Sequence, residues 1–188
     1  MTIPSCDRIA LADLVDYAAG ELSEAEAAVL EDHLFTCAAC GARAADVETL
    51  ARAIGRAVRL GDVGGFVTEA VLNQMARDGV RVRAYALSPG ALVPCAVWEG
   101  DEVMALRLRG DFGDADELTL TQRAGGVEVI RVTGHVDTSS GEITYVESAA
   151  RIRELPAVDL EIVVTAHGGG EQRLVGRYTL RHEGPLHR

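Results

Sequence analysis

Apolar residues in the first 79 positions recur with the period of an α-helix. In the first such stretch they lie three and four positions apart, at Leu11, Leu14, Val15 and Ala18. Gly20 follows, and glycine often ends a helix because it adopts the left-handed conformation without steric strain. The pattern therefore predicts a short first helix that ends near Gly20.

A second helix is predicted directly after this glycine. Ser23 and Glu26 form the S-x-x-E pattern of a capping box, in which each side chain bonds to the backbone N–H of the other residue. Ala27, Leu30 and Leu34 follow at helical spacing. We therefore expect Ser23 to begin a helix that runs up to the next cysteine.

Two further helices are predicted before residue 80. The longer one carries a long amphipathic stripe, with arginine and acidic residues on its other face. Its apolar stripe consists of Val47, Leu50, Ala51, Ile54 and Val58. The shorter one begins after Thr68, a good N-cap residue, and ends at Gly79. Residues 61–66 lie between them and read GDVGGF, and three glycines in six positions predict a flexible connection.

After Gly79 the apolar pattern changes to a period of two, which is the period of a β-strand. Eight short runs of this kind follow, with turn residues between them. They span residues 80–87, 92–98, 103–109, 117–123, 127–134, 142–148, 159–166 and 173–180. Because no long helical pattern separates them, we expect an antiparallel β-sandwich or barrel rather than a parallel sheet.

The change of period predicts two domains and a fold class with separate α and β parts. Residues 1–79 form the expected all-α domain, and residues 80–188 form a β-sandwich that senses a signal or binds another molecule. A chain of 188 residues with 48% apolar content is long enough to bury a core in each.

Charge and composition narrow the class of protein. The 29 acidic and 18 basic residues give a net charge of -11, which disfavours binding to nucleic-acid phosphates. No run approaches the roughly 20 apolar residues of a membrane-spanning helix, and the N-terminus lacks the pattern of a secretory signal. All 18 basic residues are arginine, which is typical of GC-rich bacterial genomes. We expect a cytoplasmic bacterial protein with no direct contact to nucleic acid or membrane.

Three of the four cysteines lie before residue 41 and form a metal-ligand pattern with a histidine. His33 and Cys37 are four residues apart, so they share a face of the predicted second helix, and Cys40 follows after a turn. Structural zinc sites use four nitrogen and sulfur ligands in a tetrahedron. Cys6 supplies the fourth ligand if the first two helices pack antiparallel. We therefore predict a Zn²⁺ site at Cys6, His33, Cys37 and Cys40.

Other interpretations of these residues stay open at the level of the sequence. Asp7 or a water molecule can take the fourth position in place of Cys6. A buried histidine beside three small apolar thiols is the alternative without a metal, and the spacing favours metal ligation over it. A reducing cytoplasm disfavours a static disulfide framework.

The order of these features resembles the zinc-associated anti-sigma family. Cys6, a helix, the phrase Gly20-Glu21-Leu22-Ser23, a second helix and H-x3-C-x2-C follow one another within residues 5–60. The resemblance implies a helical module that wraps an extracytoplasmic-function sigma factor and blocks its polymerase-binding surfaces. Some relatives release the sigma factor when oxidation expels zinc, and this implies a redox role for Cys6 with Cys37 or Cys40. The strand-rich part is not covered.

The third and fourth helices are the expected contact surface for such a partner. Val58, Leu72 and Met75 lie in apolar stripes that a small core need not bury, so we predict that they bind the partner. Closure of the domain itself, or association between copies of the chain, would also explain these stripes. A second hypothesis treats the zinc module as an adaptor, attached to a ligand-binding sandwich, with a non-sigma partner.

The strand-rich part offers little support for an enzyme. Its candidate polar residues are scattered, at His135 with Asp137, His167, His182 and Cys95. The H-x-H pair of a cupin metal site does not occur in the sequence. Cys95 follows a proline in an apolar run, which favours a small buried residue over a nucleophile. We expect a protein-binding regulator without catalytic activity.

Overall fold

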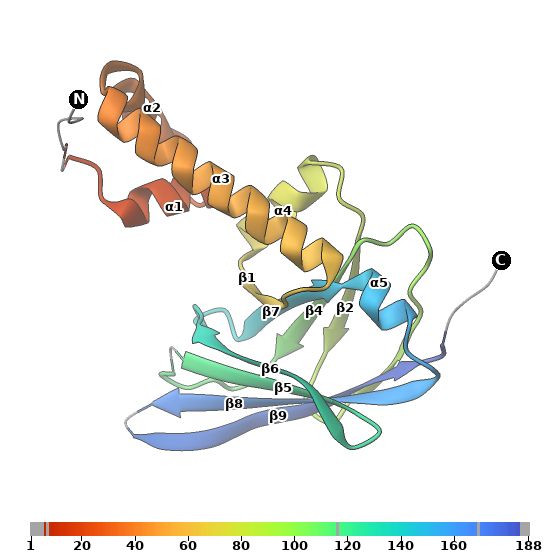
Figure 1. Ribbon diagram of the computed structural model, residues 1–188. Helices are drawn as coiled ribbons and strands as arrows, with labels where there is room; N and C mark the ends of the chain where they lie inside the picture. The colour runs from red at the N-terminus through yellow and green to blue at the C-terminus, as the bar shows by residue number, and fades with distance from the viewer. Residues whose placement is uncertain (1–5, 7, 116, 169, 185–188) are drawn as a thin grey trace.

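The computed structural model describes residues 6, 8–115, 117–168 and 170–184, and its first half is helical (Figure 1). The helices are α1 (Leu11–Ala19), α2 (Glu24–Thr36), α3 (Ala38–Leu60) and α4 (Glu69–Arg77). The end signals expected from the sequence are present. Gly20 caps α1 in the left-handed conformation with φ 73°, Ser23 and Glu26 form the capping box of α2, and Thr68 caps α4. The four predicted helices are confirmed.

The strand-rich half forms two sheets. A short strand, β1 (Gly65–Val67), precedes α4, and the remaining strands coincide with the eight predicted runs. These are β2 (Val82–Leu87), β3 (Leu92–Cys95), β4 (Val103–Arg109), β5 (Glu117–Ala124), β6 (Val127–His135), β7 (Glu142–Ser148), β8 (Val158–Gly168) and β9 (Glu171–His182). A short helix, α5 (Ala149–Arg153), follows β7. The predicted combination of an α part and a β part is confirmed.

Strand directions differ in part from the antiparallel expectation. The first sheet has the order β1-β7-β4-β2 and the second the order β3-β9-β8-β5-β6. Strands β2 and β4 pair in parallel, as do β3 and β9, whereas the other pairs are antiparallel. After β2 the chain reverses and crosses to the second sheet as β3. It reverses again and returns to the first sheet as β4, so β4 runs in the same direction as β2.

The main core lies between the two sheets. Leu106 and Tyr145 from the first sheet and Leu120, Ile162 and Tyr178 from the second are fully buried in one apolar cluster. Residues on both faces of β4 are buried, so β4 is covered on its outer face as well. The β half therefore has a layer packed against it from outside.

That outer layer is made by the helices. Val58 near the end of α3 and Leu72 of α4 pack against Val103, Ala105 and Val146 on the outer face of the first sheet. Around this contact, the Arg107 guanidinium and the Glu69 carboxylate form an ion pair of 2.9 Å, and the Ser148 hydroxyl donates to the Arg59 carbonyl at 2.8 Å. The end of α3 and all of α4 thus belong to the packing of the β half.

The stretch predicted as a flexible connection, residues 61–66, is used differently in the structure. Gly65 and Phe66 belong to β1, which pairs with β7 in antiparallel register. A Cβ on Gly64 would lie 2.2 Å from the Tyr145 hydroxyl, so only glycine fits at this approach. The last two residues of the predicted connection therefore belong to the first sheet.

Among the described helices, none combines the length and apolar character that a membrane crossing requires.

A buried polar pair joins the two sheets inside the main core. Gln122 of β5 donates from Nε2 to Oε1 of Glu147 on β7 at 3.2 Å. The remaining side-chain oxygens, Gln122 Oε1 and Glu147 Oε2, are buried and form no hydrogen bond within the described structure. Burial raises the pKa of Glu147 to about 7, against the opposing effects of the Gln122 bond and the Arg151 charge. A proton on Oε2 gives this buried pair a second donor.

We predict that this carboxyl makes stability depend on pH. Its pKa is raised in the folded state, so its contribution is complete below the unfolded value of 4.5 and is lost as the pH rises through about 7. Each pKa unit corresponds to about 1.4 kcal/mol, so the loss is roughly 3 kcal/mol. The Glu147→Gln variant should therefore gain stability relative to wild type between pH 5 and pH 8, measured by urea unfolding. Glu161→Gln, on exposed β8 surface, is the control. A difference between Glu147→Gln and wild type that does not change with pH contradicts the prediction.

Candidate metal centre

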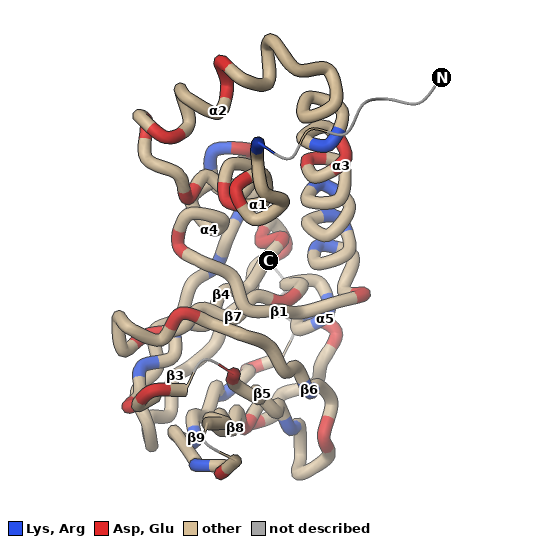
Figure 2. The backbone as a smooth tube through the Cα atoms, turned by 90° about the vertical axis from the view of Figure 1, so that its left-hand side faces the viewer, with Lys and Arg blue, Asp and Glu red and all other residues tan. Residues whose placement is uncertain are grey.

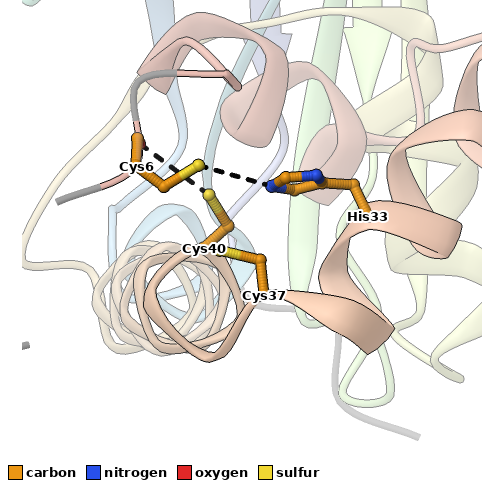
Figure 3. A group of neighbouring side chains, drawn as sticks. All are labelled: Cys6, His33, Cys37 and Cys40. Atoms are coloured by element: carbon orange, nitrogen blue, oxygen red, sulfur yellow. Dashed lines mark hydrogen bonds between the residues drawn. The ribbon is translucent and has the colours of Figure 1, made fainter. Parts of the chain in front are cut away.

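Four side chains from three parts of the helical half converge at one point (Figure 3). Cys6 precedes α1, His33 lies in the last turn of α2, Cys37 joins α2 to α3, and Cys40 lies in the first turn of α3. Their ligand atoms all lie within 4.8 Å of one another. The structure thus brings together the four residues that were predicted from spacing.

The backbone at Cys37 explains how the last three residues meet. Cys37 is extended, with φ -121° and ψ 99°, and serves both as the C-cap of α2 and as the N-cap of α3. Its N–H donates to the His33 carbonyl and its carbonyl accepts from Gly41, so both helices end on the same residue. One non-helical residue is enough to turn the chain, which keeps His33 and Cys40 on the inside of the bend.

The donor set fits a small tetrahedral ion. Cys6 Sγ lies 3.6 Å from His33 Nε2. Two ligands at Zn–S about 2.3 Å and Zn–N about 2.0 Å, separated by the tetrahedral angle, lie about 3.6 Å apart. Cys40 is fully buried and the other three residues are half-buried, so the site is closed to bulk solvent on one side. Three thiols and one imidazole match the soft and borderline ligands that zinc prefers.

The two cysteines at the start of α3, its N-cap Cys37 and Cys40 in its first turn, differ in their ionisation. The backbone N–H of Cys40 lowers the pKa of the Cys37 thiol, whose sulfur lies at the N-terminus of α3. Desolvation by burial raises the pKa of the Cys40 thiol to about 11. Cys37 is therefore the first of this pair to offer a thiolate, and a bound cation would favour the thiolate of Cys40 in turn.

Arg43 ties the N-terminal segment to α3. Its Nη1 donates to the carbonyl of Cys6 at 3.3 Å and to the carbonyl of Ile9 at 3.2 Å. Cys6 lies outside any helix, and these bonds hold its backbone beside Cys40 together with the contact from Cys40 Sγ to the Cys6 carbonyl at 3.9 Å. The sequence reasoning missed this residue, since an arginine one turn after a cysteine on a helix carries no distinguishing signal.

The core around the cluster is small. Apart from Cys40 itself, its buried members among the described residues are Ile9, Leu14, Leu30 and Ala44. A core of this size stabilises three helices weakly, and small domains of this kind usually need a metal or disulfides. All four cysteines are free thiols in this structure. The bonds to a metal ion would therefore supply much of the helical half's stability.

Other predicted site residues lie elsewhere. Val58 and Leu72 are buried against the first sheet, so in this structure they are not available to a partner, and Met75 is half-buried. Val58 and Leu72 are covered because the end of α3 and α4 pack on the first sheet, which the sequence did not indicate. Asp7, the alternative fourth ligand, lies outside the described residues.

The scattered polar residues of the β half do not form a second cluster. Within the described residues, the group of Cys6, His33, Cys37 and Cys40 is the one in which three or more possible ligand atoms lie close enough together to share a metal ion. His167 Nε2 lies 2.8 Å from the Thr119 hydroxyl, and the two ring nitrogens of His182 are buried without a hydrogen bond in the described structure. Cys95 is buried, as expected, and desolvation by burial raises its pKa.

Comparison with known proteins supports the assignment of the N-terminal segment. Residues 6–41 match the model of a family described as "Putative zinc-finger", and this segment contains all four residues of the cluster. The resemblance to a zinc-finger family that was predicted for this segment is confirmed over these residues. The match ends within the first turns of α3 and leaves the β half unassigned.

The comparisons with curated proteins and with solved structures add no information about function. No curated protein matches the chain. Among solved structures, the N-terminal domain of phage TP901-1 ORF48 is similar over 55% of this chain and 99% of that chain, with 12% sequence identity and a TM-score of 0.36. A similarity this low supports no inference about the β half.

We predict that Arg43 sets metal affinity without being a ligand. Arg43→Ala removes both bonds to the segment that carries Cys6, and loss of such supporting contacts lowers metal affinity by about 10- to 100-fold. Competition titration with a zinc chelator measures the change. Arg52→Ala is the matched control, because Arg52 lies exposed on the same helix with an ion pair to Glu48. Equal affinities of the two variants would refute the role of Arg43.

Proposed function

We propose that this protein is an anti-sigma factor of the bacterial cytoplasm. It binds an extracytoplasmic-function sigma factor through its helical half, keeps it from RNA polymerase, and catalyses no reaction. The observation that carries the proposal is the closed cluster of three cysteines and one histidine, within a segment that matches the zinc-finger domain of anti-sigma factors. The net charge of -11 suits a protein partner with basic faces.

Zn²⁺ is the metal we assign to the cluster. When bound, it supplies four bonds that cross-link the segment before α1, the end of α2 and the start of α3. Cys6, Cys37 and Cys40 would bind it through thiolates and His33 through Nε2, the ring nitrogen nearest to Cys6. The protein's own part is to hold these four groups at ligand distance before the ion arrives.

The helical half also offers apolar surface for a partner. Several large apolar side chains are exposed there in the described structure, at Leu11, Val15, Val29, Phe35, Leu50, Ile54 and Leu60. Single exposed apolar residues are ordinary, but a concentration of them on three neighbouring helices is typical of an interaction surface. This supports protein binding as the activity, whether the partner is a sigma factor or another protein.

The metal assignment predicts one zinc ion per chain in the purified protein. Cys37→Ser and His33→Ala should each abolish stoichiometric zinc, and should melt the helical half at lower temperature because its apolar core is small. Plasma emission spectrometry and circular dichroism measure the two effects. Cys95→Ala, in the β half, is the control and should keep its zinc. A folded wild-type protein without bound metal would exclude the assignment.

Sigma binding is tested by co-expressing the tagged chain with each extracytoplasmic-function sigma factor of its source bacterium. We expect one of them to co-purify at a fixed stoichiometry and to lose transcription activity in vitro when the chain is added. Absence of any such complex, with the zinc site intact, would favour an adaptor with a non-sigma partner.

A further inference from the structure

A groove runs between the helical half and the first sheet. It is lined by α1, α3 and α4, by β1, and by the turn that joins β6 to β7, and its volume is about 1920 Å³. Pockets for small molecules measure about 300 to 1000 Å³, so this groove has the size to hold a segment of secondary structure instead. Figure 1 shows α3 spanning the space between the N-terminal helices and the sheets.

The wall formed by α3 is an exposed apolar stripe. Val47, Leu50, Ala51 and Ile54 line the groove, and Leu50 and Ile54 are 62% and 53% exposed. Across from them, Val15 of α1 is 48% exposed. Intervals of three and four positions put these residues on one helix face, which is the arrangement that receives the apolar face of another helix.

This stripe is exposed because α3 spans two separate cores. Its first turns pack around the metal cluster through Cys40 and Ala44, and its end packs on the first sheet through Val58. The middle turns, with Leu50 and Ile54, belong to neither core. A rigid helix cannot bend to bury them, so they stay in solvent unless another molecule covers them.

The position of α4 keeps the groove open. The Thr68 hydroxyl donates to Glu21 Oε1 in the turn between α1 and α2 at 2.7 Å, and Glu69 pairs with Arg107 of the first sheet. Contacts in both directions hold α4 as the second wall, with Val71 and Met75 along it. The site thus contains residues of both halves of the chain.

The charges on the groove are predominantly acidic. Seven acidic residues and four arginines line it, and two of the arginines, Arg52 and Arg109, already form ion pairs with acidic residues of the same groove. Four of the acidic residues form no ion pair in the described structure, namely Glu21, Asp78, Glu102 and Asp137. Figure 2 shows acidic residues on α1, α2 and α4, and arginines along α3.

We propose that this groove binds one amphipathic helix of the partner protein, with an apolar face against Leu50 and Ile54 and basic residues along its flanks. The proposal rests on the proposed function, because the partner is then the sigma factor. It adds that the β half is part of the docking site, since Asp137 and the first sheet form one side of the groove. A change in the β half that moves α4 would alter partner affinity directly.

A second copy of the chain does not have the basic surface that the acidic groove would favour. Each copy carries a net charge of -11, and the groove is itself acidic, so two copies repel one another there. Nucleic acid is excluded by the acidic rim and the apolar wall. A basic amphipathic helix matches both features of the groove.

The test compares sigma-factor affinity among variants by isothermal titration calorimetry, with zinc content and circular dichroism confirming that each is folded. Ile54→Glu should weaken binding at least about 10-fold, since it places a charge on the apolar wall. Asp137→Arg, in the β half, should weaken binding at low salt, with an effect that shrinks as salt is added. Val127→Glu is the control, because Val127 is 67% exposed on β6 and lies outside the groove.

The possible outcomes separate this inference from the proposed function. Loss of binding in Ile54→Glu and Asp137→Arg, with Val127→Glu unchanged, supports the groove as the docking site. If wild type binds the sigma factor and Ile54→Glu binds it equally well, the groove is not the docking site, and the anti-sigma proposal stands. If wild type binds no sigma factor, both proposals fall. Self-association of wild type that Ile54→Glu abolishes would assign the groove to a second copy, against the proposal.

Discussion

The structure depends on one continuous helix that belongs to two cores. Helix α3 begins at Ala38, directly after Cys37 of the metal-ligand cluster, and ends at Leu60 near the first sheet. Its 23 residues span about 34 Å at 1.5 Å per residue. Because a helix of this length is stiff, the orientation of its first turn sets the direction of its last. Helix α3 therefore connects the metal-ligand cluster to the packing of the β half.

The two cores that α3 joins differ greatly in strength. The core between the sheets has twenty buried members among the described residues, whereas the core around the cluster has five. Hydrophobic burial scales with area, so the β half is stable by its own packing and the helical half depends on its ligands. Loss of the metal would loosen α1 and α2 while leaving the end of α3 and α4 docked on the sheet.

Local signals in the sequence predicted most of the elements. Capping at Ser23 and Thr68, the stop at Gly20 and the alternation in eight apolar runs each arise within a few residues, and all correspond to elements of the structure. The cluster was also predicted from spacing, because three of its members lie within one helix and a turn. Cys6 needed the resemblance to a family, since its approach depends on Arg43 and on the packing of α1.

Long-range contacts account for what the sequence did not indicate. Strand β1 has three residues and forms only because β7 offers an edge. Helix α5 has five residues. Both elements are too short to show a periodic pattern of apolar residues in the sequence. The parallel pairing of β2 with β4 follows from a crossing between sheets. The burial of Val58 and Leu72 depends on α4 docking on the sheet, which left Leu50 and Ile54 as the exposed part of the stripe.

The central claim is that Cys6, His33, Cys37 and Cys40 together hold one zinc ion. X-ray absorption spectroscopy at the zinc edge of the purified protein tests it most directly. The account predicts a four-coordinate ion with three sulfur ligands at about 2.3 Å and one nitrogen at about 2.0 Å. A first shell with two or fewer sulfurs, or one dominated by oxygen, would contradict it.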